Sequence, residues 1–190
     1  QLVISGGLFH GLQLWVNLPA AQKMVSPAYQ NLDADQVKLF TTPDAGTLVR
    51  LIAGDIAGIQ GPGSTRTPIV MAHATILPGS QMVLPWNPAF NALAHVVKGS
   101  GFVGIDRHAF SVGHTAVFGT GDSITLAASP HEALDVILLG GQPIGEPVEQ
   151  YGPFVMNTRA ELQQAMDDYQ RGRLGTVPSG GVQPYRGPRK

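Results

Sequence analysis

Histidine and acidic side chains are the groups in this chain that could bind a metal or transfer protons. His108 and His114 lie six residues apart, with Asp106 as the nearest carboxylate. A metal site at the two histidines would need help from that carboxylate. Glu146 and Glu149 could form an acid pair for proton transfer. The spacing brings neither group together, so we expect surface histidines and solvated glutamates.

Common signatures of catalysis are absent from the sequence. The chain has no G-x-S-x-G motif, no glycine-rich phosphate loop and no H-E-x-x-H pair. The glycines of residues 99–101 precede no expected helix and therefore cannot direct a helix N-terminus at phosphate. Cysteine is also absent, which excludes disulfides and thiolate chemistry and suits a reducing cytoplasm. We therefore expect a cytoplasmic location.

The composition indicates many short strands joined by turns. Charged residues make up only 13% of the 190 residues, and the chain contains 24 glycines and 15 prolines. No apolar run is long enough for a membrane span, and none is expected. The chain has neither an initial methionine nor a signal peptide, and it starts inside a strand-like run. We therefore expect a truncated or processed chain.

Strand-like runs recur at roughly ten-residue spacing, which is typical of a sandwich or barrel. Residues 67–77 form the longest apolar run and are expected to be a central strand. His73 within that run is interpreted as a hydrogen-bonded core histidine. Residues 108–113 are expected to be a loop. The other predicted strands are residues 8–19, 36–40, 47–53, 56–60, 115–118, 123–127 and 133–139.

Residues 78–106 have the layout of a strand pair. An apolar run is broken at residues 86–88, a buried strand is expected over residues 91–98, and residues 99–101 supply a tight turn. Residues 102–105 are then expected to pair back as a hairpin. This layout resembles the first conserved motif of the cupin superfamily, a small β-barrel that often carries a metal.

The metal ligands of that motif are missing here. The cupin pattern places a His-x-His pair, a spacer, a glutamate and six further residues before a turn glycine. With Gly99 as that glycine, the glutamate position falls on Ala92. The histidine positions fall on Pro85 and Asn87, or on Trp86 and Pro88. Alanine, proline and tryptophan offer no side-chain lone pair to a cation, and asparagine is a weak ligand for a transition metal.

The second cupin motif offers at most one ligand. It is expected to begin at Gly121 and Asp122, and its histidine position then falls on Glu132, with His131 one residue early. One histidine does not make a metal site. The resemblance therefore implies an all-β, cupin-type double-stranded β-helix (a jelly-roll barrel) without its metal.

One helix is predicted near the C-terminus, over residues 158–173. Thr158 and Glu161 form a capping box, and Gly172 is placed to end the helix. An apolar stripe of Leu162, Ala165, Met166 and Tyr169 follows the cap. We expect this stripe to pack on the outer face of the barrel.

Several sequence blocks together resemble the pirin family of bicupin proteins, over about residues 6–175. HGLQLWVNLP and GPFVMNT are the most specific blocks, and the helix with Asp168 and Tyr169 also fits. The blocks are HGLQLWVNLP at 10–19, KM at 23–24, PAYQ at 27–30, TRTP at 65–68, HTAVFGTGDSI at 114–124 and GPFVMNT at 152–158.

The resemblance implies two tandem cupins, with iron or another divalent metal held in the first. The ligands, three histidines and a glutamate, lie upstream of the HGLQLWVNLP block. That half is missing here, so no metal or other cofactor is expected in this chain. The family's activities include quercetin 2,3-dioxygenase-type chemistry and transcriptional co-regulation through protein partners.

The expected organisation has four parts. Residues 1–20 form a strand segment that follows the missing N-terminal cupin, and residues 21–157 form a metal-free cupin. The helix at 158–173 and a flexible basic tail at 174–190 complete the chain. Five of the 12 basic residues and none of the 13 acidic residues lie from Arg171 onward. We expect a solvated tail, without direct nucleic-acid binding.

The expected partners follow from the resemblance and from the apolar start of the chain. The missing N-terminal cupin would normally cover residues 8–19. Without it, Leu8, Phe9, Leu12, Leu14 and Trp15 would form an exposed patch that favours a homodimer.

Three functional hypotheses remain open from the sequence. The first is the structural and interaction half of a pirin-like protein. The second is a catalytic fragment, with Gln13 as a candidate for a pocket shared with the first half. The third is a module that binds a regulatory protein, acting as a transcriptional co-regulator without catalysis.

Overall fold

The computed structural model of the chain describes residues 10–175. By their contacts, these residues belong to two compact units. The first unit contains residues 10–25 and 146–174, and the second is built on residues 26–145. The expected division at residues 20, 157 and 173 stays a prediction, and most of the expected basic tail lies outside the described residues.

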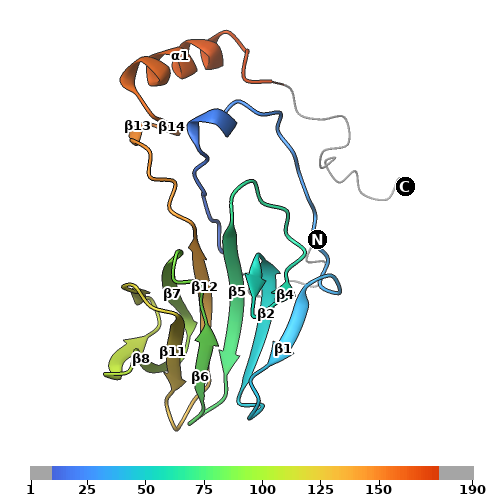
Figure 1. Cartoon of the computed structure of the whole chain (residues 1–190), viewed down its shortest axis with the longest axis vertical. Helices are drawn as coiled ribbons and strands as arrows, with labels where there is room; N and C mark the ends of the chain where they lie inside the picture. Colours follow the sequence, from blue (N-terminus) through green and yellow to red (C-terminus); the bar gives the residue numbers. More distant parts are fainter. Residues whose placement is uncertain (1–9, 176–190) are drawn as a thin grey trace, which may run out of the picture. The chain divides into compact units, whose positions relative to one another are not determined.

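The second unit contains a large antiparallel sheet of six strands (Figure 1). Its strand order is β1-β2-β5-β12-β7-β10, so the latest strand of the sheet in sequence, β12, lies between β5 and β7. The strands are β1 (Lys38–Thr41), β2 (Thr47–Ala53), β5 (Ile69–Ile76), β7 (Asn91–Lys98), β10 (Thr115–Val117) and β12 (Leu134–Gly141).

A second antiparallel sheet of four strands has the order β6-β11-β8-β9. The strands are β6 (Gln81–Pro85), β8 (Ser100–Val103), β9 (His108–Ser111) and β11 (Ser123–Ala128). A small hairpin of β3 (Asp55–Ile56) and β4 (Ile59–Gln60) follows β2.

Alternating burial along the strands builds one core between the two sheets. In β5 every second residue is buried, and β2, β7 and β12 follow the same alternation for most of their length. Leu51, Ile76 and Leu138 of the large sheet pack in one cluster with Met82 and Leu126 of the small sheet. The all-β jelly-roll with one C-terminal helix is confirmed. Within the described residues, however, no strand ladder joins the two sheets into a closed barrel.

The predicted hairpin between residues 91–98 and 102–105 is wrong. β7 pairs with β12 and β10, whereas β8 pairs with β11 and β9 in the other sheet. Gly99 lies between them with φ +84°, and a Cβ on it would stand 2.0 Å from the Ala133 carbonyl oxygen. The glycine therefore lets the chain pass from one sheet to the other, instead of turning back on β7.

Two shorter segments also differ from expectation. Residues 108–113 were expected to be a loop, but His108–Ser111 forms β9 because it pairs with β8. Residues 56–60 were expected to be one strand. They contain a tight turn instead, because Ala57 and Gly58 both have positive φ (54° and 82°).

The first unit contains η1 (Ala20–Gln22), β13 (Glu149–Tyr151), β14 (Phe154–Met156) and α1 (Arg159–Gln170). The strand predicted over residues 8–19 is wrong for residues 10–19, which contain no strand. The apolar, β-branched composition of this run is strand-like, but no neighbouring strand pairs with it in the described structure. Residues 8 and 9 lie outside the described residues.

The helix α1 begins as the sequence predicts. Thr158 accepts a hydrogen bond from the backbone N–H of Glu161 (3.2 Å), and the Glu161 carboxylate accepts one from the N–H of Asn157 (3.1 Å). Leu162 is buried, and the Tyr169 ring meets Phe154 of β14 edge-to-face at 5.9 Å. The partner that the structure shows for the helix is thus the β13–β14 hairpin. Among residues 10–175, no helix has the length and apolar character needed to cross a bilayer.

Candidate functional site

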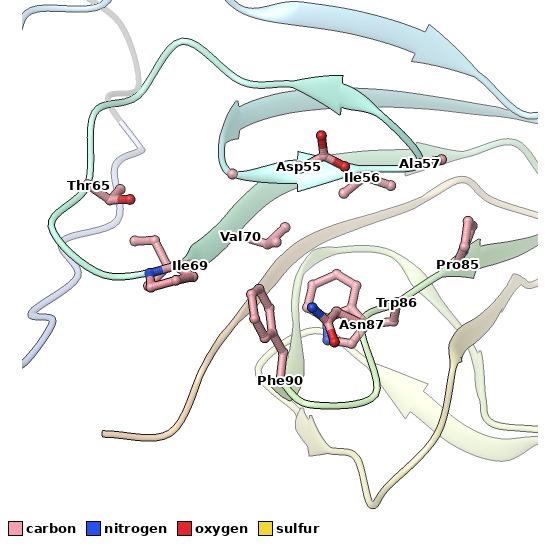
Figure 2. A pocket seen from close by; sticks show the side chains of 12 residues that line it. Asp55, Ile56, Ala57, Thr65, Ile69, Val70, Pro85, Trp86, Asn87 and Phe90 are labelled. Carbon is pink, nitrogen blue, oxygen red and sulfur yellow. The ribbon is translucent and has the colours of Figure 1, made fainter. Parts of the chain in front are cut away.

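A pocket of about 370 Å³ opens in the second unit where the loop after β6 faces β3 and the start of β5 (Figure 2). In Figure 2, Trp86 and Phe90 of that loop lie across the pocket from Ile56 and Val70. Most of the lining is apolar. The full lining is Gly54, Asp55, Ile56, Ala57, Thr65, Pro68, Ile69, Val70, Pro85, Trp86, Asn87 and Phe90.

The two histidines of the cupin pattern fall on Pro85 and Asn87 or on Trp86 and Pro88, and three of these four residues line the pocket. Pro85, Trp86 and Asn87 line it, while Ala92, at the glutamate position, is buried in β7. Proline offers no ligand atom, and an indole nitrogen is only a donor. The Asn87 side-chain oxygen accepts the backbone N–H of Ala89 at 2.9 Å. These residues do not fit a transition metal.

The Trp86 indole packs directly against the backbone of a glycine in β12. Its side chain is 7% exposed, and a Cβ on Gly140 of β12 would stand 2.5 Å from its Cζ2 atom. The Trp86 Nε1–H is buried and finds no acceptor among residues 10–175. Buried donors of this kind are rare in native proteins.

The other candidate ligands from the sequence do not gather into a site. His131 and Glu132 lie in the turn between β11 and β12, where the Glu132 carboxylate accepts a hydrogen bond from Ser100 Oγ at 2.5 Å. Asp106, His108 and His114 are exposed. Within residues 10–175, no cluster of three or more histidine, aspartate and glutamate side chains could hold a metal ion.

Glu146 and Glu149 face different partners in the first unit. The Glu146 carboxylate accepts hydrogen bonds from the Ala20 N–H (2.7 Å) and from Asn157 Nδ2 (2.8 Å). The Glu149 carboxylate lies 3.9 Å from the Arg159 guanidinium. The two glutamates therefore tie segments of this unit together and do not form an acid pair.

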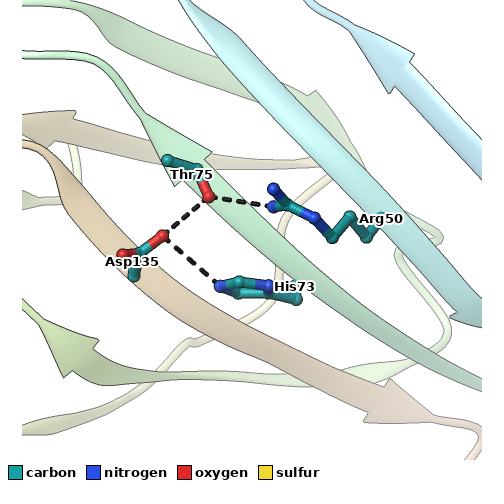
Figure 3. Close-up of polar contacts among 4 residues, drawn as sticks. All are labelled: Arg50, His73, Thr75 and Asp135. Carbon is teal, nitrogen blue, oxygen red and sulfur yellow. Dashed lines mark hydrogen bonds and ion pairs between the residues drawn. The ribbon is translucent and has the colours of Figure 1, made fainter. Parts of the chain in front are cut away.

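A polar cluster crosses the large sheet on the face away from the core (Figure 3). Arg50 on β2 donates to Thr75 Oγ1 (2.9 Å), and Thr75 donates to Asp135 Oδ1 (2.6 Å). The same carboxylate oxygen lies 3.4 Å from His73 Nε2. The sequence predicts a hydrogen-bonded core histidine at His73. It does contact a polar partner, but its side chain is 30% exposed on the outer face.

Burial is the main cause that lowers the pKa of His73 below its ordinary value of 6.5. The positive charge of Arg50 lowers the pKa further, while Asp135 opposes both effects through its charge and hydrogen bond. The hydroxyl of the cluster, Thr75 Oγ1, donates to Asp135 and not to His73, so the histidine is not paired with a nucleophile. Its arrangement is that of a cross-strand network that fixes three neighbouring strands.

Gln13 lies in residues 10–19 of the first unit and is exposed. Its role in a pocket shared with a first cupin stays a prediction. Sequence reasoning missed the pocket beside Trp86, because its walls come from segments far apart in the chain. Two sequence features pointed to this pocket. The apolar run breaks at residues 86–88, and the TRTP block supplies Thr65 and Pro68 to the lining.

Two facing antiparallel sheets with an apolar core place this chain in the cupin class. The chain belongs to the pirin family: residues 71–175 match the family described as the pirin C-terminal cupin domain. Pirin-1 of Arabidopsis thaliana is 40% identical over 169 residues, which cover 87% of this chain and 58% of that protein. Pirin of Homo sapiens is 35% identical over 168 residues, covering 87% of this chain and 57% of the human protein.

Solved structures give the same result. A quercetin 2,3-dioxygenase from Acinetobacter baumannii superposes with a TM-score of 0.79 at 32% identity, covering 86% of this chain and 56% of that one. GK1651 from Geobacillus kaustophilus superposes with a TM-score of 0.62 at 30% identity, covering 70% and 54%. The chain thus spans less than two thirds of the length of these relatives.

Proposed function

We propose that this chain is the metal-free C-terminal cupin of a pirin-type bicupin protein. In this proposal, an N-terminal cupin holds iron or another divalent metal and carries quercetin 2,3-dioxygenase-like chemistry. The present chain supplies structure and interaction surface. The observation that carries the proposal is the match to the C-terminal cupin of the family, in a chain with Ala92 at the glutamate position and no histidine at residues 85–88.

Exposed apolar side chains in the first unit support an interaction role. Leu12, Leu14, Trp15 and Val16 are 52%, 46%, 71% and 51% exposed. A groove beside them, also within the first unit, is lined by Trp15, Met24, Phe154 and Met156 among others. Apolar groups exposed together in this way mark interaction surfaces. We assign this surface to the N-terminal cupin. A cytoplasmic location, suited to the cysteine-free composition, belongs to the same proposal.

Metal analysis of the 190-residue chain tests the proposal directly. The purified chain is loaded with Fe²⁺ under nitrogen, dialysed and measured by inductively coupled plasma mass spectrometry. We expect iron far below one equivalent, because Pro85, Trp86 and Ala92 cannot ligate it. Tightly bound stoichiometric iron would contradict the proposal. So would oxygen uptake with quercetin by this chain alone.

Capture of an N-terminal cupin tests the interaction role. The N-terminal cupin of a pirin relative is expressed separately and mixed with the immobilised chain. We expect capture that weakens when Leu14 and Trp15 are both changed to Ser. A matched control changes Ile105 to Ser, an apolar side chain that is 90% exposed in the second unit. Equal capture by both variants would remove the residue 12–16 surface from the proposal.

A further inference from the structure

The pocket beside Trp86 is not explained by the proposed function. We infer that this pocket binds a flat, uncharged aromatic molecule that carries a hydrogen-bond acceptor. The inference rests on the apolar walls, on one exposed donor, on one buried donor without an acceptor, and on the position of one carboxylate. It concerns residues of the second unit only.

The walls select a flat apolar body. Trp86 and Phe90 lie on one side, and Ile56 and Val70 lie on the other (Figure 2). Trp86, Ile56 and Val70 also belong to the core and are 7%, 2% and 4% exposed, so the half-buried Phe90 is the ring most open to a ligand. Aromatic side chains favour stacked or edge-on contact with another ring. The volume of about 370 Å³ lies in the range of small-molecule pockets.

Asn87 supplies a donor whose orientation is fixed. Its side-chain oxygen already accepts the Ala89 N–H at 2.9 Å, which settles the direction of the amide. Its Nδ2 group donates to no side chain or backbone among residues 10–175. The amide therefore has its NH₂ donors free for a molecule in the pocket, while its oxygen already accepts one hydrogen bond.

Trp86 supplies the second donor. Its Nε1–H is shielded from water and has no acceptor within the described part of the chain. An unsatisfied buried donor costs free energy, and an acceptor bound beside the indole would remove that cost. Because the nitrogen is shielded, binding must turn or shift the indole slightly, and this shift makes Trp86 a sensitive reporter.

The single charge of the lining disfavours anions. Asp55 is its only charged residue, and no lysine, arginine or histidine lines the pocket. Its carboxylate accepts the Gly58 N–H at 2.9 Å, which holds it at the tip of the small β3–β4 hairpin. A negative ligand would approach this charge without a cation to offset it.

Coumarin is the probe for this inference, because it is flat, uncharged and carries two acceptor oxygens. The ¹⁵N-labelled 190-residue chain is titrated with coumarin up to millimolar concentration. The chain has two tryptophans, so its spectrum holds two indole N–H signals, and Trp15→Phe assigns them. We expect the Trp86 signal to shift in a saturable way and by more than the signal of Trp15, which lines the exposed groove of the first unit.

Matched variants and a charged probe test the chemistry. Asn87→Asp keeps the acceptor for Ala89 and removes the Nδ2 donor, so coumarin should bind about five-fold more weakly. Coumarin-3-carboxylate should bind less tightly than coumarin, and Asp55→Asn should reduce that difference. No shift at Trp86, equal shifts at both tryptophans or unchanged affinity in Asn87→Asp would each overturn the inference.

Discussion

Gly140 on β12 has no side chain and therefore leaves the space that the Trp86 indole occupies. A Cβ at this position would stand 2.5 Å from Trp86 Cζ2 and 2.2 Å from the Asn91 carbonyl oxygen. The first neighbour could move only by displacing a buried indole, and the second belongs to the backbone of β7. Any side chain at this position must therefore distort the large sheet or the pocket wall.

Gly140→Ala should destabilise the protein by roughly 2 kcal/mol, because the added methyl overpacks a closed site. Urea unfolding followed by circular dichroism measures this change. Gly119→Ala is the control, since a Cβ there meets nothing within 4 Å and its backbone lies outside the left-handed region. The prediction fails if the two variants are equally stable.

The charges around His73 make opposite predictions for its titration. Arg50→Gln removes a positive charge and should raise the pKa of His73, whereas Asp135→Asn removes the opposing charge and should lower it. The ¹H–¹³C signal of the His73 ring, followed against pH, measures both variants. Shifts of the same sign in both would contradict the electrostatic account.

The lowered pKa of His73 also predicts how stability depends on pH. The unfolded chain takes up a proton at this residue near pH 6.5, whereas the folded chain does so only at lower pH. Stability is therefore fully present above pH 6.5 and is lost as the pH falls through the folded pKa. His73→Gln should lose less stability than the parent between pH 7.5 and pH 5, as measured by urea unfolding.

At the scale of elements, the sequence predicts strands better than it predicts their partners. The strand at residues 67–77 and the helix after Thr158 are confirmed, because apolar alternation and a capping box are local signals. The prediction of a hairpin across Gly99 is wrong, because a glycine with positive φ is found both in hairpin turns and where a chain crosses between sheets. Pairing depends on segments far apart in the chain, and periodicity does not encode it.

The candidate site shows the same limit. Counting the cupin pattern back from Gly99 is enough to find the residues that stand at the ligand positions. It does not supply the facing wall, because Ile56 and Val70 reach the pocket only after β3 and β5 have formed. Residues 10–19 show the reverse error, since a strand-like composition forms no strand where no partner strand adjoins it.

The start of α1 gives a prediction for one element. Thr158→Ala removes the side-chain acceptor for the Glu161 N–H and should weaken the helix by about 1 kcal/mol. Amide hydrogen exchange in residues 159–170 should become about five-fold faster, which corresponds to that loss. Thr158→Ser keeps the acceptor and is the control. Equal exchange in the Ala and Ser variants would show that the cap contributes nothing.

At the scale of the whole molecule, the apolar side chains of residues 12–16 predict self-association. The 190-residue chain should form dimers at high concentration, because Leu14 and Trp15 are exposed. Sedimentation velocity over a concentration series measures the effect. Changing both residues to Ser should weaken the dimer, whereas Val117→Ser, at a side chain 80% exposed in the second unit, should not. A monomer at every concentration would contradict the prediction.

The central place of β12 in the large sheet has a consequence for synthesis on the ribosome. β5 and β7 leave the exit tunnel first, and each of them pairs with β12. The β1-β2-β5 group and the β7-β10 pair cannot join until residue 141 has emerged. Until then, both groups expose strand edges that can recruit other nascent chains. Chains stalled before residue 141 has emerged should therefore be the ones that holdase chaperones bind.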